Sequence, residues 1–480
     1  MSHTVRLNVL TEDEIQQIHQ ATLEVLERTG VKVICDEALE LLRDAGCEVD
    51  GDIVHIPPQL VEEAIDSAPE TFLLYDRNGE NPMPVGGWQT YYGTGVTNLY
   101  FRDIQTGDRR PTRVQDIRDA AKLCDFLPNY DWIMPLGSAQ DAPHAAGDVY
   151  EFEAAVTNTT KPIVFITNDR KGTQDVLEMA SVVAGGRQAL IDRPFVMAYP
   201  EPASPLFHVP QAAEKLLYSA EFGMPVIYTP CPMSGGTAPV TMASLLAIVN
   251  AECLSGLVMA QLKNKGIPFV IGGVPTIMDM ARGTISYGAP EMSLALSGYA
   301  DIAHHYRLPT WGTAGCSDSK LPDEQAAIES TFSCLMNGLA GINMVHDPGF
   351  INSGLMGSLE MLVMTNEIIG MVRRMLKGIP VNEETLATDV IQQVGPAGHF
   401  LTQDHTVKHF RREHWFPNLM DRTPYEQWAK EGRKSMADRV KEETLSILES
   451  HVPEPLDDDT LRELRVIRER SVEERTASPV

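Results

Sequence analysis

The sequence predicts an α/β protein built around a (β/α)8 TIM barrel. From Gln89 onward, apolar runs of strand length recur eight times, and a helical pattern of apolar residues follows each run. Strands that alternate with helices form right-handed βαβ units with a parallel sheet, and eight units over roughly 290 residues close most simply as a barrel. We expect the strands at about residues 89–94, 132–137, 162–167, 194–199, 224–229, 268–273, 308–313 and 341–346. We expect the helices near residues 114–126, 145–158, 173–185, 208–222, 239–265, 289–306, 322–338 and 358–376.

A doubly wound open sheet is the alternative that the same alternation allows. Such a sheet binds phosphate through a GxGxxG motif that follows its first strand. The corresponding stretch here, Tyr92-Gly-Thr-Gly-Val-Thr-Asn98, lacks the third glycine. The barrel is therefore preferred.

The segments before and after the barrel complete the domain plan. Residues 1–86 are expected to form an α/β cap, because Thr11-Glu-Asp-Glu14 is a capping box that begins a helix. In the same segment, Asp50-Gly51 lies between two alternating runs and predicts a β-hairpin. The barrel and catalytic domain is assigned to residues 87–380. The alternation then stops, so residues 381–480 are expected to be a C-terminal helical extension with a charged tail.

Composition excludes several classes of protein. The chain has 66 Asp and Glu against 39 Lys and Arg, a net charge of −27, whereas a nucleic-acid binder needs a basic surface. No segment approaches the roughly 18 uninterrupted apolar residues of a membrane span, and the first residues lack the apolar core of a signal peptide. We therefore expect a cytoplasmic protein that binds neither nucleic acid nor membrane.

The cysteine and histidine patterns do not predict a metal site. Seven cysteines are scattered and form no CxxC pair, which fits a reducing compartment. His405, His409 and His414 have the approximate spacing of one helix face, but no carboxylate follows in HExxH form. A helical cap is the preferred interpretation of that stretch.

Aromatic residues recur at the expected ends of the strands, where a (β/α)8 barrel keeps its functional groups. Aromatic ring faces around a cavity hold quaternary ammonium groups through cation–π attraction. Sealing the barrel explains any single ring equally well, but the collective arrangement favours a cage for such a cation. The predicted cage residues are Tyr92, Tyr199, Tyr228, Trp311 and Phe350.

Two polar residues accompany these rings. His346, at the end of the eighth strand, fits an acid–base role, a metal ligand or a donor to a substrate carboxylate. Asp318 follows the seventh strand and is interpreted either as a partner of Lys320 beside the ligand or as a turn residue. Cys316 is the one cysteine at a predicted strand end, and no base can be placed beside it as a nucleophile requires.

Several motifs resemble the trimethylamine methyltransferase family, in particular its members that lack pyrrolysine and demethylate quaternary amines such as glycine betaine. The resemblance runs almost from end to end and is specific for the family but not for the substrate. The motifs are His19–Leu26, Val49–Val54, Cys316–Ala326, Asn366–Val372 and Gly398–Trp428.

The resemblance implies a barrel enzyme that transfers a methyl group from a methylammonium compound to cobalt(I) of a separate corrinoid protein. The cofactor would therefore be supplied by a partner, with no metal or cofactor bound to this chain. Because the chain lacks pyrrolysine, we expect its substrate to be a quaternary amine R–N⁺(CH₃)₃ and not trimethylamine. The leaving group of such a substrate is already a neutral amine. The task then reduces to positioning and desolvating the cation, with His346 binding the carboxylate of a betaine and no protein nucleophile.

Two other functions are left open. One is a metal-dependent barrel lyase or hydrolase that uses His346, Asp318 and Glu201 around a divalent ion. The other is a betaine-binding protein without catalysis. The choice among glycine betaine, proline betaine, carnitine and related amines is open as well, and the long caps favour a homo-oligomer.

Overall fold

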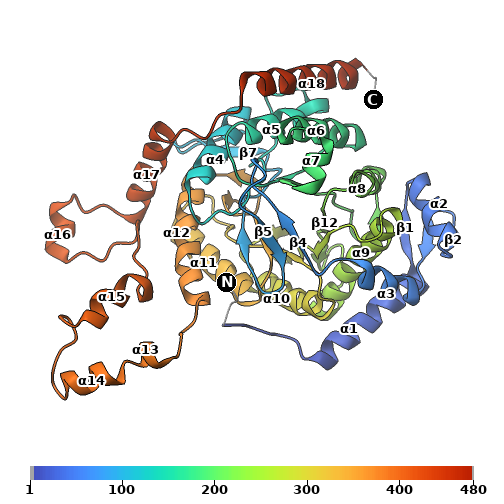
Figure 1. Cartoon of the computed structure of the whole chain (residues 1–480). Helices are drawn as coiled ribbons and strands as arrows, with labels where there is room; N and C mark the ends of the chain where they lie inside the picture. The colour runs from blue at the N-terminus through green and yellow to red at the C-terminus, as the bar shows by residue number, and fades with distance from the viewer. Residues whose placement is uncertain (1–4, 478–480) are drawn as a thin grey trace.

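A parallel sheet of seven strands lies at the centre of the computed structural model, which describes residues 5–477 (Figure 1). Its strands follow the chain in order, except that the first strand pairs with the last one. Seven of the eight predicted strands are confirmed. They are β6 (Tyr91–Tyr92), β9 (Ile163–Phe165), β10 (Val196–Ala198), β12 (Val226–Tyr228), β14 (Phe269–Gly272), β17 (Thr310–Thr313) and β18 (Met344–His346).

The remaining predicted strand, near residues 132–137, lies between the two edges of this sheet, β6 and β9. The Asp131 N–H donates to the Tyr92 carbonyl over 2.8 Å, and the Ile133 N–H donates to the Pro162 carbonyl over 2.9 Å. Ile133 also forms an isolated parallel bridge with Ile163. One short segment thus hydrogen-bonds to both edges of the sheet.

Helices surround the sheet, as the ring of ribbons in Figure 1 shows. The eight predicted helices are confirmed to within about three residues at each end, and the structure adds a short helix, α7 (Arg187–Asp192). Helical sequences place one apolar face on the sheet, which accounts for the accuracy of the periodic pattern. The confirmed helices are α4 (Val114–Phe126), α5 (Gly147–Val156), α6 (Arg170–Ala184), α8 (Pro210–Phe222), α9 (Met242–Lys263), α10 (Pro290–His305), α11 (Glu324–Leu339) and α12 (Leu359–Leu376).

Helix α9 is the one helix of the described residues that is long and apolar enough to cross a membrane. Most of its residues are buried inside the protein, where it packs against α8, β14 and the N-terminal helices α1 and α3. Apolar character all round a helix is typical of a core helix as well as of a membrane span. Its burial here identifies α9 as a core helix.

The N-terminal segment contains the predicted capped helix and hairpin. The capping box of Thr11 and Glu14 is present at the start of α1 (Glu12–Glu24), which continues through a π-helical turn (Val25–Thr29) to Gly30. The predicted hairpin is formed by β2 (Glu48–Asp50) and β3 (Ile53–His55). The other elements are β1 (Val31–Val33), α2 (Asp36–Asp44), α3 (Pro58–Ser67), β4 (Thr71–Leu74) and β5 (Met83–Gly86).

This segment shares its core with the helices around the central sheet. Side chains of α1, α2 and α3 lie in one apolar cluster with those of α8, α9 and α10. Strand β1 pairs in parallel with β11 (Phe207–His208), which follows β10, while β4 and β5 place Leu74, Met83 and Val85 in the cluster inside the sheet. Residues 1–86 are therefore packed as an integral part of the fold.

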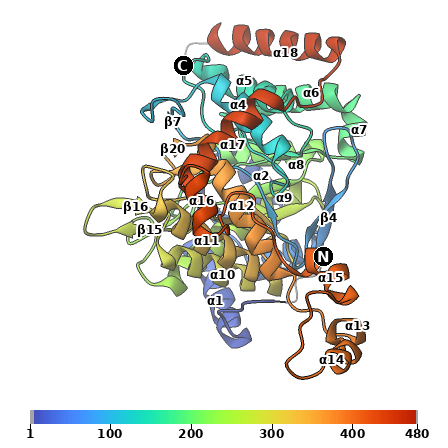
Figure 2. The ribbon, with the colours of Figure 1, turned by 90° about the vertical axis from the view of Figure 1, so that its left-hand side faces the viewer.

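Two small sheets lie in the loops that follow the carboxyl ends of the central strands. One consists of β7 (Tyr100–Arg102), β8 (Arg109–Pro111), β19 (Phe350–Ile351) and β20 (Met356–Gly357). The other consists of β13 (Met233–Ser234), β15 (Thr276–Asp279) and β16 (Thr284–Ser286), and Figure 2 shows its hairpin projecting from the body. Because both sheets follow strand ends, they surround the edge of the central sheet at which a functional site is expected.

The C-terminal extension is helical, as predicted. Two of its helices pack on the body: α17 (Met436–Ser450) lies against α4 and α12, and α18 (Asp458–Ala477) crosses α5 and α6 (Figure 1). The four helices between α12 and α17 stand away from the body in Figure 1. These are α13 (Glu383–Leu386), α14 (Thr388–Val394), α15 (Asp404–Glu413) and α16 (Tyr425–Lys430).

Candidate functional site

Four rings meet at the carboxyl ends of the central strands. The Trp311 ring lies 5.1 Å from the Trp132 ring, 5.4 Å from the Tyr199 ring and 4.6 Å from the His346 ring, measured between centroids. All four side chains are buried, and the indole nitrogens of both tryptophans have no hydrogen-bond partner in the described part of the chain. The centre of the candidate site is thus an aromatic cluster, and we define it by Trp132, Tyr199, Trp311 and His346.

His346 is a neutral side chain with both nitrogens engaged. Its Nδ1 lies 2.8 Å from the Gly312 carbonyl oxygen, which can only accept, so Nδ1 carries the hydrogen. Its Nε2 lies 3.2 Å from Oδ1 of Asp347. Burial lowers the pKa of His346 to about 4, so Nε2 is an acceptor at neutral pH.

Asp347 completes this pair as a buried acid. Burial raises the pKa of Asp347 well above its ordinary value, and the charge of Glu201 raises it further. A protonated carboxyl donates its hydrogen to the neutral Nε2 of His346. Its other oxygen, Oδ2, is buried without a hydrogen-bond partner among the residues that the structure describes. The backbone of Asp347 has φ +81°, a conformation that costs free energy and is found most often at functional sites.

A glycine allows the chain to pass close to this acid. A Cβ atom on Gly95 would lie 2.8 Å from Oδ1 of Asp347 and 2.5 Å from Cζ of the Phe350 ring. Neither contact is tolerated, so only glycine fits here. The same geometry places the Phe350 ring beside Asp347.

Glu201 adds a second carboxyl group. Burial raises the pKa of Glu201 to about 7, and the positive charge of Lys215 opposes this rise. The Lys215 ammonium donates to the Thr167 carbonyl over 2.8 Å. Burial raises the pKa of Tyr199 and of the half-buried Tyr287, and the charges of Glu201 and of Asp347, respectively, raise them further. The site therefore contains two acids whose charges act on each other and on the phenols around them.

Tyr92 and Tyr228 do not face this cluster, which corrects the predicted cage. The Tyr92 hydroxyl donates to the Cys334 carbonyl of α11 over 2.9 Å, and the Tyr228 hydroxyl lies 2.6 Å from Nδ1 of His208. Both rings point outward to the helices, while their strand neighbours Tyr91 and Ile227 pack inside. Successive side chains of a strand face opposite sides, so an error of one residue reverses the direction of a ring.

Asp318 organises loops and is not part of the cluster. It accepts hydrogen bonds from the Tyr287 and Gly288 N–H groups at 2.8 and 3.1 Å, and from the hydroxyls of Ser286 and Ser353. These bonds join the β15–β16 hairpin to the loops after β17 and β18. Its predicted pairing with Lys320 is absent, because the Lys320 ammonium donates to the Asp318 carbonyl instead.

Three residues of the site were not predicted from the sequence. Trp132 lies on a predicted strand, and correct assignment of the inward face would have found it. Asp347 directly follows His346 and carried no pattern of its own. Tyr287 comes from the β15–β16 hairpin, and no local signal connects that hairpin to the end of β18.

The described residues 5–477 contain no group of three or more His, Cys, Asp or Glu side chains arranged to hold a metal ion. The trio His346, Asp318 and Glu201 is accordingly not assembled, since Asp318 is bound to its four donors. Of His405, His409 and His414, the first two have ring centroids 4.3 Å apart, and both contact Glu384.

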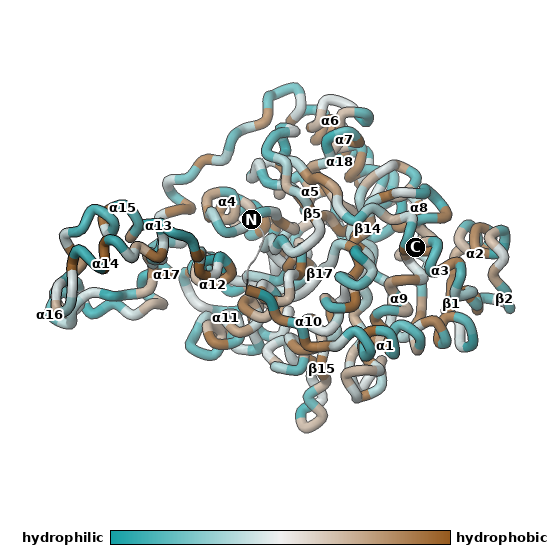
Figure 3. The backbone as a smooth tube through the Cα atoms, turned by 60° about the horizontal axis from the view of Figure 1, so that its bottom comes forward, coloured by the Kyte–Doolittle hydropathy of each residue, from teal (hydrophilic) through white to brown (hydrophobic). Residues whose placement is uncertain are grey.

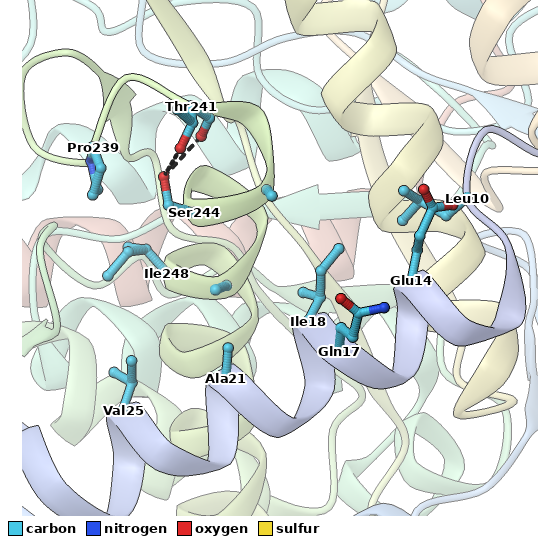
Figure 4. A pocket seen from close by; sticks show the side chains of 12 residues that line it. Leu10, Glu14, Gln17, Ile18, Ala21, Val25, Pro239, Thr241, Ser244 and Ile248 are labelled. Atoms are coloured by element: carbon cyan, nitrogen blue, oxygen red, sulfur yellow. Dashed lines mark hydrogen bonds between the residues drawn. The ribbon is translucent and has the colours of Figure 1, made fainter.

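A groove of about 590 Å³ lies elsewhere, between α1 and the start of α9 (Figure 4). Its walls are largely apolar, with Ile18, Val25 and Ile248 among them. Its one carboxylate, Glu14, already accepts from Thr11 in the capping box. The chemistry of the protein is therefore concentrated at the strand ends and not in this groove.

Comparisons with known proteins agree on one family. The family model described as trimethylamine methyltransferase (MTTB) matches residues 1–475. The trimethylamine methyltransferase MttB of Desulfitobacterium hafniense (strain DSM 10664 / DCB-2) is 37% identical over 469 residues, which cover 97% of this chain and 94% of that protein. The glycine betaine methyltransferase of Desulfitobacterium hafniense (strain Y51) is 34% identical over 456 residues, which cover 94% of each chain.

A solved structure supports the fold. The monomethylamine methyltransferase MtmB of Methanosarcina barkeri matches with a TM-score of 0.54 at 11% identity, covering 94% of this chain and 90% of that one. The family match spans nearly the whole chain, and both relatives are similar over almost their full length. The chain belongs to the trimethylamine methyltransferase family.

Proposed function

We propose that the protein transfers a methyl group from a quaternary amine of the betaine type to cobalt(I) of a separate corrinoid protein. The observation that carries this proposal is the aromatic cluster of Trp311, Tyr199 and Trp132 beside two carboxyl groups. Ring faces attract a cation that cannot donate hydrogen bonds. The relative that is a glycine betaine methyltransferase supports the same substrate class.

The rings and acids would divide the work of binding. The trimethylammonium group would lie against the faces of Trp311 and Tyr199, where water is excluded and the electrostatic attraction is strong. Glu201, with its pKa of about 7, would supply negative charge opposite the cation. A bound cation would lower that pKa, because a nearby positive charge favours the ionised carboxyl.

The chemistry then requires little from the protein. Cobalt(I) of the corrinoid would supply the electron pair for the new bond to the methyl carbon, and the electron pair of the broken C–N bond would stay on nitrogen. The amine leaves neutral, so no proton has to be delivered. The residues of this chain hold the cation in line and exclude water.

His346 has a different role in this proposal from the one that the sequence suggested. The expected bond from His346 to a substrate carboxylate is not supported, because Nδ1–H is bound to the Gly312 carbonyl and Nε2 faces Asp347. We assign His346 to positioning Asp347. The contact of His346 with Oδ1 would then fix the orientation of the carboxyl group, and with it the position of the buried Oδ2 of Asp347.

We also propose that the parallel sheet closes as a (β/α)8 barrel, with residues 131–134 as the eighth strand. The hydrogen bonds of Asp131 and Ile133 to both edges of the sheet support closure. The likeness to MtmB over 94% of this chain supports the same architecture.

Methyl transfer in a defined mixture tests the proposal. The purified chain is incubated with a reduced corrinoid protein or free cob(I)alamin and with glycine betaine, proline betaine, carnitine or trimethylamine, and the cobalt spectrum is followed. We expect demethylation of at least one quaternary amine in preference to trimethylamine, and a purified chain with no corrinoid absorbance of its own. Binding of a betaine without methyl transfer to any acceptor would instead favour the binding-protein alternative.

A further inference from the structure

Residues 379–434 form an extension that we call the arm, and it is ordered but stands apart from the body. Figures 1 and 3 show it projecting to one side in two views. Its base is held to α12: the Glu367 carboxylate accepts from three successive backbone N–H groups that begin at Asn418. Within the arm, Glu384 pairs with Lys408 and His409. The arm is thus a folded, anchored structure.

The surface of the arm is unusually apolar for a segment without a covering partner. Ile379 is 86% exposed and Leu401 is 80% exposed. Folded monomers rarely expose many large apolar side chains together, and such surfaces mark sites of association. The exposed apolar side chains of the arm are Ile379, Val381, Leu386, Ile391, Phe400, Leu401, Val407, Phe416 and Tyr425.

Charge is distributed unevenly along the arm. Residues 379–404 carry four Asp and Glu and no Lys or Arg, whereas residues 405–434 carry seven Lys and Arg and four Asp and Glu. The first half is therefore acidic and the second half basic. In a two-fold contact the same surface occurs on both partners, so that residue i meets residue j and j meets i. Such a contact brings the acidic half of one arm to the basic half of the other.

We propose that two copies of this chain associate through their arms in a two-fold contact. Each copy carries a net charge of −27, so two bodies repel each other. The arm, with its basic half, is where two such copies can approach. A second copy is also always present in equal amount, and it covers the apolar surface permanently. A corrinoid protein that binds only transiently would leave that surface exposed whenever it is not bound. This inference does not depend on the proposed function.

Sedimentation equilibrium of the full chain, from nanomolar to micromolar concentration, measures the association. We expect wild type to have twice the 52.9 kDa of one chain or a multiple of that dimer. The double variant Ile391→Glu/Leu401→Glu should weaken dimerisation at least tenfold. Val466→Glu is the matched control, since Val466 is 63% exposed on α18, and it should leave the dimer intact. Because all three positions are exposed, far-UV circular dichroism should show the same fold.

A charge exchange tests the two-fold arrangement. Arg411→Glu/Arg412→Glu should weaken the dimer, as should Glu383→Lys/Asp389→Lys. The chain with all four substitutions should dimerise again, because each half then meets its complement. A monomeric wild type at micromolar concentration, dimers that survive the apolar substitutions, or a fourfold variant that stays monomeric would overturn the proposal. Association of a monomeric wild type only with an added corrinoid protein would overturn it too, and would assign the arm to that partner.

Discussion

At the scale of single residues, the geometry of the site depends on a few side chains that have no freedom to move. The Nδ1–H of His346 is fixed by the Gly312 carbonyl, and its Nε2 faces Oδ1 of Asp347. Gly95 leaves room for both Asp347 and Phe350. A site built in this way is suited to positioning a rigid cation, because hydrogen bonds and close contacts hold its side chains in place.

Trp311 is expected to contribute most to cation binding, since it contacts three other rings of the cluster. Trp311→Ala should weaken the affinity for a quaternary amine by about 0.5–2 kcal/mol, which is roughly twofold to thirtyfold in Kd. Isothermal titration calorimetry measures this. Tyr92→Phe is the matched control: Tyr92 lies behind the sheet, and its loss of one hydroxyl should leave Kd unchanged. An unchanged Kd in Trp311→Ala, with the fold intact, would remove Trp311 from the binding site.

Glu201 predicts a pH dependence of binding. Its pKa is raised to about 7, so the carboxyl is protonated below neutral pH and ionised above it. Affinity for a quaternary ammonium ion should therefore rise as the pH increases from 6 to 8, because the ligand keeps its charge throughout. Glu201→Gln, which cannot ionise, should bind more weakly at pH 8 and show a flat profile. Equal pH profiles for the two proteins would exclude Glu201 as the titrating group.

At the scale of elements, the C-terminal helix α18 is joined to the barrel helices by charged pairs of very different burial. Arg475 donates to both oxygens of Asp148 at 2.6 and 3.0 Å, and both side chains are buried. Asp148 also accepts from the Asn168 N–H in the loop after β9. This pair therefore connects α18, α5 and a loop at the strand ends.

Loss of Arg475 should be costly for this reason. Arg475→Ala leaves Asp148 buried without its guanidinium, and breaking a buried pair destabilises a protein by about 3–5 kcal/mol. Arg462→Ala on the same helix removes only an exposed i, i+3 pair with Asp459 and should cost less than about 1 kcal/mol. Urea unfolding measures both variants. Similar losses of unfolding free energy in the two variants would show that burial of the Arg475–Asp148 pair does not add to stability.

At the scale of the whole molecule, the N-terminal segment and the helices around the central sheet form one core. Leu26, Val31 and Val54 share an apolar cluster with Leu254 and Leu257 of α9, and all five side chains are completely buried. Parallel pairing of β1 with β11 adds backbone hydrogen bonds between the two regions. The expected boundary at residue 86 therefore separates stretches of sequence and not independently packed units.

Removal of residues 1–86 should therefore prevent folding. The fragment 87–480 would expose the apolar surface of α9 that α1 and α3 cover, and exposed apolar surface of this kind leads to aggregation. Expression of the fragment, followed by size-exclusion chromatography and circular dichroism, measures the outcome. A soluble, monodisperse and helical fragment would contradict the single core.

The sequence by itself determined what depends on neighbours along the chain. The eight helices and seven of the strands follow from periodic burial, the capping box of Thr11 and Glu14 from local hydrogen bonding, and the hairpin at Asp50-Gly51 from turn preferences. The family followed from motifs spread over the chain. Each of these signals is carried by residues that are near one another along the chain.

Tertiary structure decided what depends on contacts between distant segments. Tyr92 and Tyr228 were assigned to the wrong face because an inward or outward direction depends on register, which is set by packing on both sides of the sheet. The hydrogen bond of His346 to Gly312, the approach of Gly95 to Phe350, and the binding of Asp318 by the β15–β16 hairpin join segments that are far apart in sequence. Only the folded chain brings these groups together, because loop conformation and side-chain direction are settled by the atoms that surround them.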